Sequence, residues 1–165
     1  NDGEGNFTEA TEFSGLEDPG WHISLTLADY DRDGWVDVLR GSADVGFRLF
    51  RNAGNSRAET SGNNWVALRL RPEPDRAASA YGAAAVGARI TLTDTSGRRH
   101  RREVRLGEGH GGNFDVTQHV GLGAETVLHA EVRWPDGFVQ ELPPLEVNTT
   151  YVVPRAASVS ATPPQ

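Results

Sequence analysis

Apolar and polar residues alternate in short segments along this chain, with the period of two that places every second side chain on one face of a β-strand. Gly, Pro, Asn and Asp, which favour turns, separate these segments. The segments lack the apolar spacing of three to four residues that is typical of an amphipathic helix. The pattern therefore predicts an all-β protein.

Residues 65–154 show the most regular alternation. Two hairpins are expected in this region, one turning at residues 94–97 and one at residues 135–137. Val104 and Leu106 are expected to point inward, with the neighbouring arginines outward. The expected strands are residues 65–71, 88–93, 99–106, 118–122, 128–134, 138–142 and 149–153. Seven or so short strands of this kind predict a β-sandwich.

Residues 1–54 predict a smaller, four-stranded antiparallel unit that resembles one blade of a β-propeller. Its expected strands are residues 7–9, 23–27, 35–39 and 47–51. Residues 55–64 are polar and predict a linker, and residues 155–165, rich in Ala, Ser and Pro, predict a flexible tail. Because a lone blade leaves both sheet faces uncovered, we expect neighbouring blades or other copies of the chain to cover them.

The acidic loop (residues 29–37) joins two expected strands of the first unit. It carries carboxylates at its first, third, fifth and ninth positions and a glycine, Gly34, at its sixth. Alternate acidic positions in a tight loop bring several hard oxygens to one point, as Ca²⁺ requires, and glycine permits the turn. A solvated acidic turn without an ion is the alternative. The predicted ligands are the carboxylates of Asp29, Asp31, Asp33 and Asp37 and the main-chain carbonyl of Trp35.

The acidic loop differs from an EF-hand. The twelfth position, a bidentate glutamate in that motif, is Arg40 here. Both flanking segments alternate as strands do, so the ion is expected in the turn of a β-hairpin.

Composition limits the compartment and the chemistry. The net charge is −7, which argues against nucleic acid as the main partner. There is no cysteine and no lysine, so disulfides, thiolate metal sites and lysine Schiff bases are excluded. A weak acidic loop fills with Ca²⁺ at the millimolar concentrations found outside the cytoplasm, which indicates a secreted, extracellular or periplasmic protein. The chain has no long apolar span, so no membrane span is expected.

The first unit resembles one FG-GAP/VCBS-type repeat of the calcium-binding β-propellers. The residues that carry this resemblance are 1–7, 28–37 and 49–52. In such blades the acidic loop joins neighbouring strands and holds Ca²⁺, which implies the same ligands here. The resemblance also implies that the chain is the C-terminal part of a larger propeller or a subunit of an assembly.

The second unit resembles an ASPIC/UnbV domain, which usually follows FG-GAP/VCBS repeats. The matching residues are 63–70, 86–92, 120–123 and 131–137. Residues 110–115 depart from the family, which more often has a Ser-x-Asn-type stretch there. The resemblance brings no catalytic residues, so it implies an architecture more than an activity.

Three further groups of residues offer alternatives. Glu108, His110, Asp115 and His119 fall within a glycine-rich stretch that could gather them into a transition-metal or acid–base site. A run of arginines at 98–105 could bind an acidic partner, although a solvated outer sheet face is the better explanation. The four tryptophans could stack on sugars, although two of them, Trp65 and Trp134, lie in alternating strands that favour packing; the others are Trp21 and Trp35.

Together these features predict a non-enzymatic, calcium-binding extracellular protein with a structural or adhesive role in protein–protein or protein–glycan contacts. The alternative is a carbohydrate-binding module of a secreted enzyme or surface complex. A weaker hypothesis is a hydrolase that uses Glu108 and Asp115.

Overall fold

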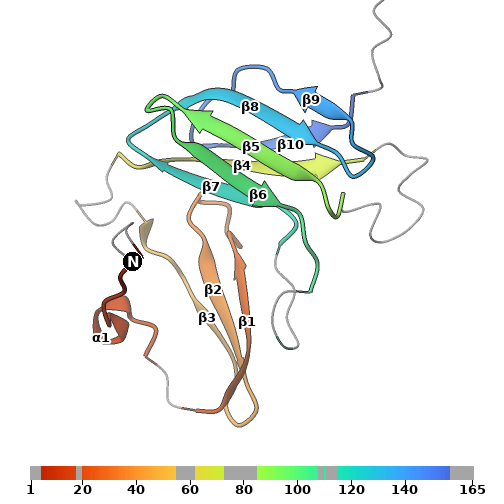
Figure 1. Ribbon diagram of the computed structural model, residues 1–165. Helices are drawn as coiled ribbons and strands as arrows, with labels where there is room; N and C mark the ends of the chain where they lie inside the picture. The colour runs from red at the N-terminus through yellow and green to blue at the C-terminus, as the bar shows by residue number, and fades with distance from the viewer. Residues whose placement is uncertain are drawn as a thin grey trace, which may run out of the picture.

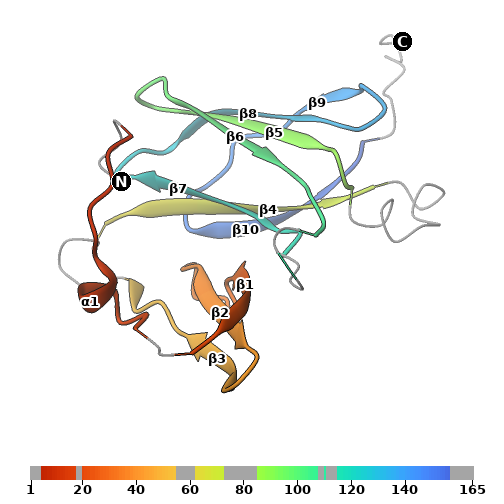
Figure 2. The same cartoon turned by 60° about the horizontal axis from the view of Figure 1, so that its bottom comes forward.

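The computed structural model describes residues 5–17, 20–54, 62–72, 85–107, 110 and 115–156. These residues form three β-sheets and one helical turn, α1 (Thr11–Ser14), as Figures 1 and 2 show. The prediction of an all-β protein is therefore confirmed. Within the described residues, no helix is long and apolar enough to cross a membrane.

The first sheet contains β1 (His22–Ala28), β2 (Asp37–Ser42) and β3 (Gly46–Phe50), joined as an antiparallel meander in that order. It has three strands where the sequence predicted four, because residues 7–9 are extended but unpaired. Phe7 is 80% exposed, so its apolar ring has no sheet face to pack on. The strand after the acidic loop begins at Asp37 and not at Trp35, since Trp35 and Val36 belong to the loop.

The other two sheets form a sandwich. One has the order β10-β4-β7, with β10 parallel to β4, and the other has the order β6-β5-β8-β9, with every pair antiparallel. Figure 2 shows the two sheets lying face to face. The strands are β4 (Asn64–Arg71), β5 (Arg89–Asp94), β6 (Arg99–Glu103), β7 (Gln118–Gly123), β8 (Val127–Arg133), β9 (Val139–Glu141) and β10 (Thr149–Pro154).

The hydrophobic core lies between the two sandwich sheets. Alternate residues of each strand point into it, among them Leu68 of β4 and Ile90 of β5, which are 0% and 1% exposed. Val104 is buried, as predicted, while Leu106 is half-buried. Trp134 is buried with its indole N–H donating to Gln140 Oε1 at 3.0 Å. All fifteen buried residues of this core come from the sandwich, so the β1–β3 sheet adds none to it.

Candidate metal centre

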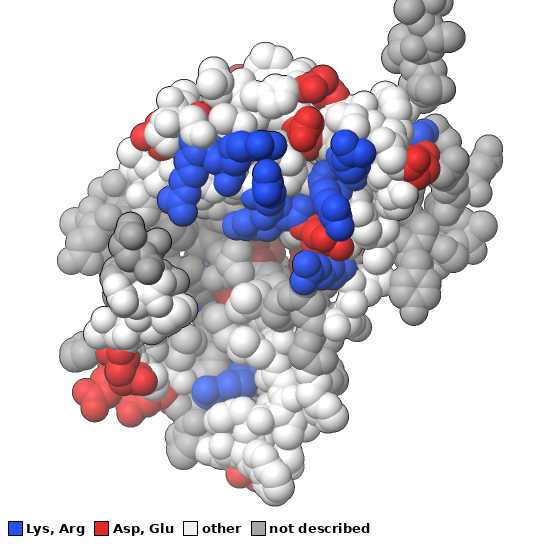
Figure 3. All heavy atoms as spheres, viewed as in Figure 1, with Lys and Arg blue, Asp and Glu red and all other residues white. Residues whose placement is uncertain are grey.

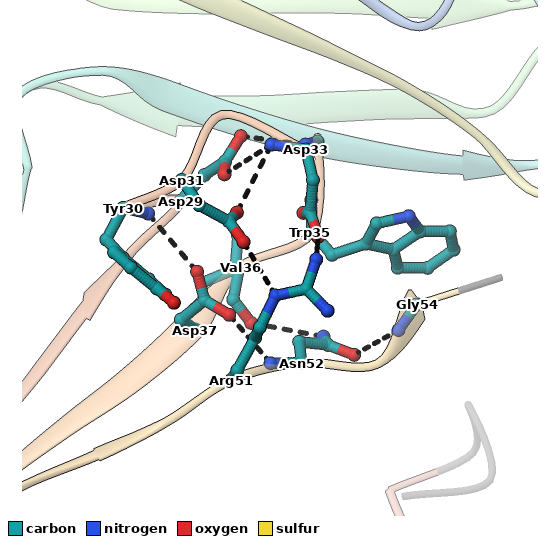
Figure 4. A network of polar contacts seen from close by, with 11 residues as sticks. Asp29, Tyr30, Asp31, Asp33, Trp35, Val36, Asp37, Arg51, Asn52 and Gly54 are labelled. Carbon is teal, nitrogen blue, oxygen red and sulfur yellow. Dashed lines mark hydrogen bonds and ion pairs between the residues drawn. The ribbon is translucent and has the colours of Figure 1, made fainter. Parts of the chain in front are cut away.

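The acidic loop closes the hairpin between β1 and β2. Ala28 and Asp37 are the last paired residues before it, so the loop's two ends are held side by side. Asp37 is 1% exposed although it carries a carboxylate, and Figure 4 shows it beneath the loop. A buried carboxylate requires hydrogen-bond donors or a cation around it.

Main-chain N–H groups supply part of that requirement. Tyr30 N donates to Asp37 Oδ2 at 3.2 Å, and Asn52 N donates to Asp37 Oδ1 at 2.6 Å. The Asn52 side chain also donates to the carbonyl of Val36 at 3.1 Å. These bonds fasten the chain that follows β3 to the underside of the acidic loop.

The remaining carboxylates shape the loop from within. Asp29 accepts from the main-chain N–H groups of Asp33 at 3.1 Å and of Gly34 at 2.9 Å. Asp33 Oδ1 accepts from Trp35 N at 2.9 Å. The loop turns through positive φ at Arg32 and Gly34, which brings its alternate side chains to one side.

Three of the four predicted carboxylate ligands converge. Asp29, Asp31 and Asp37 each place one oxygen within 4.8 Å of the others. Asp33 is absent from this group, and its Oδ2 instead accepts from Arg51 at 2.6 Å. Trp35 lies in the loop as predicted and packs its indole against Gly54, while its role as a carbonyl ligand stays a prediction.

Arg51 places a cationic side chain beside the converging carboxylates. Its Nε donates to Asp31 Oδ2 at 2.6 Å, and both partners are partly exposed. This hydrogen bond lowers the pKa of Asp31 and raises that of Arg51, so both charges are kept. The converging donors are all carboxylate oxygens, hard ligands that fit Ca²⁺ or Mg²⁺.

The acidic loop rests on the sandwich. His119 Nε2 lies 2.7 Å from the carbonyl oxygen of Gly34, and the His119 ring stacks on Trp65 with centroids 5.3 Å apart. Gly34 lies so close to Trp65 that an added Cβ would stand 2.2 Å from the indole. Burial lowers the pKa of His119, so the ring is held neutral and donates from Nε2.

The predicted group around His119 is dispersed. Glu108 lies outside the described residues, His110 is exposed, and Asp115 is an exposed residue that caps Thr117 N at 3.1 Å. Since the Nε2 of His119 is bonded to Gly34, His119 acts as a contact between the two units. Sequence reasoning missed this role, because alternation places a residue on a face but does not say what covers that face.

A second group of metal-type donors lies on the outer face of the sandwich. His129 and Glu131 of β8 and Glu141 of β9 have donor atoms within 4.8 Å of one another. Glu131 and Glu141 are direct partners in the hairpin register, and His129 pairs with Glu141 at 3.1 Å. The His129 and Glu141 side chains are 49% and 63% exposed. Only the hairpin register, which sequence alone does not give, brings these residues together.

Comparison with known proteins gives one match in the N-terminal part of the chain and one in the C-terminal part. A family model described as an FG-GAP-like repeat matches residues 1–40, and one described as ASPIC and UnbV matches residues 79–160. Cartilage acidic protein 1 of Mus musculus is 31% identical over 126 residues, and that of Homo sapiens is 30% identical over 125 residues. Each alignment covers 74% of this chain, which spans only 18% and 17% of these relatives.

Proposed function

Because this chain carries an FG-GAP-like repeat followed by an ASPIC and UnbV domain, we propose that it is a non-enzymatic, calcium-binding module of an extracellular assembly. Its role in this proposal is structural or adhesive. The ion holds the acidic loop, and the loop in turn holds the β1–β3 sheet against the sandwich. The ligands are the carboxylates of Asp29, Asp31, Asp33 and Asp37 and the carbonyl of Trp35.

The convergence of Asp29, Asp31 and Asp37 is the observation that carries this proposal. Their oxygens lie within 4.8 Å of one another in a loop between two strands. Three carboxylates at that separation repel one another, and a divalent cation converts the repulsion into a cross-link. FG-GAP-like repeats generally bind calcium, which favours Ca²⁺ over Mg²⁺.

The extracellular location rests on two supports. A partly exposed loop of this kind is expected to bind Ca²⁺ weakly. Weak binding is suited to the millimolar free Ca²⁺ outside the cytoplasm. The relatives are named for cartilage, a tissue built largely of extracellular material. We therefore propose a secreted protein, extracellular or periplasmic according to its source.

Neighbouring repeats, or other copies of the chain, are the proposed structural partners. Both faces of the β1–β3 sheet carry apolar side chains that stay substantially exposed. Register places Leu39 and Leu49 on one face, 38% and 48% exposed, and Leu25 on the other, 46% exposed. A sheet that is apolar on both faces is suited to packing between two further sheets, as a propeller blade does.

The carbohydrate-binding module remains a second candidate, favoured by one side chain. Trp21 immediately precedes β1 and is 77% exposed, as a sugar-stacking platform requires. Trp65 and Trp134 are packed and do not serve this purpose. A glycan array with wild type and Trp21→Ala separates the candidates, because binding lost with the indole supports the module and unchanged binding removes it.

Calcium-dependent stability is the main test. We expect the thermal midpoint of wild type to rise between chelator and millimolar Ca²⁺, by the equivalent of about 2.7 kcal/mol at a hundredfold excess over Kd. Asp31→Asn removes one converging charge and weakens its pair with Arg51, so it should reduce this rise. It should lower the midpoint in chelator only slightly, because the pair is partly exposed. Asp115→Asn, outside the acidic loop, should keep the full rise. Equal midpoints of wild type in chelator and Ca²⁺ would refute the proposal.

A further inference from the structure

A cleft of about 900 Å³ separates the acidic loop from the sandwich. One wall consists of the end of β1 and the start of the loop, including Leu27, Tyr30 and Arg32. The opposite wall is the outer face of the β10-β4-β7 sheet together with the end of β6. Figure 3 shows arginine side chains gathered on the sandwich beside this hollow.

Five arginines line the cleft, which concentrates positive charge in a chain whose net charge is −7. Two of these side chains contact other residues of the protein. Arg102 donates to the carbonyl of His119 at 3.1 Å, and Arg105 lies 3.8 Å from Glu103. Among the described residues, the side chains of Arg32, Arg69 and Arg101 have no ion-pair partner. The arginines are Arg32, Arg69, Arg101, Arg102 and Arg105.

The acidic residues of the cleft do not cancel this charge. Glu103 also pairs with Arg89 at 3.2 Å, so its carboxylate is shared between two guanidinium groups. Asp29 accepts hydrogen bonds from the acidic loop and is one of the converging carboxylates. The third, Asp115, caps the main chain at Thr117. A free guanidinium presents a planar fork of N–H donors that matches a sulfate or carboxylate group.

The neutral residues of the cleft favour a sugar polymer over a peptide or nucleic acid. Thr117, Gln118 and Thr150 line the same wall as the arginines and offer hydroxyl and amide groups suited to sugar hydroxyls. Arg99 and Arg101 lie on the same face of β6, two residues apart, so the arginine row continues beyond the cleft at a spacing of about 6.7 Å. Such spacing is suited to a linear polymer that carries an anionic group on each repeat.

We propose that this arginine cleft binds a linear acidic glycan, through sulfate or uronate groups on the guanidinium groups and sugar hydroxyls on the neutral wall. The inference rests on the proposed extracellular binding role and names its ligand class. The acidic loop forms one wall of the cleft, and the hydrogen bond between Gly34 and His119 holds this wall against the sandwich.

The test uses the full chain in millimolar Ca²⁺ and measures binding of a heparin-derived oligosaccharide by calorimetry. Arg69→Gln combined with Arg101→Gln should weaken this binding by about 10- to 100-fold, since each substitution removes a charge-assisted hydrogen bond. The matched control is Arg133→Gln combined with Arg98→Gln, which removes two exposed charges outside the cleft lining and outside the β6 arginine row. It should weaken binding less than threefold, as expected for the general field alone.

Two further probes define the anionic group and the polymer. Tighter binding of heparin than of hyaluronan, which carries uronate but no sulfate, assigns the site to sulfate, and equal binding assigns it to uronate. Tighter binding of poly-glutamate at equal charge overturns the proposal in favour of an acidic peptide. Equal losses in the two double variants, or no glycan binding, also overturn it. If the glycan proposal fails but the thermal midpoint still rises with Ca²⁺, the proposed calcium-binding role stands.

Discussion

Asp94 binds the turn between β5 and β6 with both carboxylate oxygens. Its Oδ1 accepts from the hydroxyl of Ser96 at 2.6 Å and from Arg98 N at 2.9 Å, and its Oδ2 lies 2.8 Å from His100 Nε2. The hydrogen bonds from Ser96 and His100 favour the charged form and lower its pKa from 3.8 to about 2. The side chain is 2% exposed, so few water molecules can replace these donors.

Acid stability should depend on this residue. Because the folded pKa lies below the unfolded value, its contribution to stability is complete above pH 3.8 and is lost as pH falls through about 2. We expect Asp94→Asn to lower the midpoint at neutral pH and to flatten the midpoint-against-pH profile in that range. Thermal denaturation from neutral pH to about pH 2 measures both. Asp115→Asn is the control, and a variant profile as steep as that of wild type would contradict the assignment.

Arg51 binds carboxylate oxygens of the acidic loop that the proposed Ca²⁺ would use. It bonds Asp31 and Asp33 at 2.6 Å each, and one of these, Asp31, belongs to the converging group. A guanidinium beside a cation site repels the ion and occupies one of its ligand oxygens.

Removal of the Arg51 charge should therefore strengthen Ca²⁺ binding but lower the stability of the protein without Ca²⁺. We expect Arg51→Gln to tighten Ca²⁺ binding several-fold and to lower the thermal midpoint in chelator. Calorimetric titration and melting curves in both buffers measure the two effects. Arg48→Gln, on β3 and away from the acidic loop, controls for net charge. Weaker Ca²⁺ binding by Arg51→Gln would show that the arginine orders the ligands and does not compete.

Most strands could be predicted because each is specified by its own alternation. The ends of β4, β7 and β10 differ from the predicted ends by a single residue. The exceptions depend on what a segment packs against. Residues 7–9 alternate as strands do, yet no described strand lies beside them, so they stay unpaired.

In the acidic loop too, the sequence predicts contacts within the loop but not contacts with distant residues. Its spacing alone predicted that four carboxylates within nine residues converge, and three of them do, Asp29, Asp31 and Asp37. The contact between Gly34 and His119 joins residues 85 positions apart and carries no local signal. The pairing of Asp33 with Arg51, 18 positions away, could not be predicted for the same reason.

Gly34 makes it possible to test how the acidic loop couples to the sandwich. Alanine at Gly34 meets two obstacles, a φ of 93° and the indole of Trp65 at 2.2 Å from the new Cβ. Alanine at Gly46, the first residue of β3, meets only the first obstacle, since its φ is 80° and nothing lies within 4 Å of the new Cβ. The difference between the two variants isolates the contact with Trp65.

We expect Gly46→Ala to cost about 1–2 kcal/mol, the cost of a left-handed alanine. Gly34→Ala should cost about 1–3 kcal/mol more, because the loop must withdraw from Trp65. Urea unfolding measures both costs, and the tryptophan emission of the folded protein reports the withdrawal. Equal costs would mean that the acidic loop moves away from the sandwich without penalty.

The whole molecule is stabilised unevenly. The buried core belongs to the sandwich, whereas the β1–β3 sheet keeps Leu25, Leu39 and Leu49 between 38% and 48% exposed. A small set of contacts holds this sheet in place: hairpin pairing, the carboxylate hydrogen bonds of the acidic loop, and the Gly34 contact with His119. Such a sheet is expected to open without the sandwich unfolding.

Hydrogen exchange should resolve these two levels. In chelator, amides of β1–β3 should exchange through openings that cost at least about 2 kcal/mol less than those that expose β4, β5 and β8. Saturating Ca²⁺ should slow exchange in the acidic loop, β1 and β2 and leave the sandwich strands unchanged, since the ion binds only the closed loop. Peptide-resolved mass spectrometry measures the exchange rates in chelator and in Ca²⁺. Asp31→Asn is the control, which should lose the slowing caused by Ca²⁺. Uniform protection across all three sheets would contradict this division, because it requires the sheet and the sandwich to unfold as one cooperative unit. The exchange pattern therefore decides whether the acidic loop opens with the β1–β3 sheet or only when the sandwich unfolds.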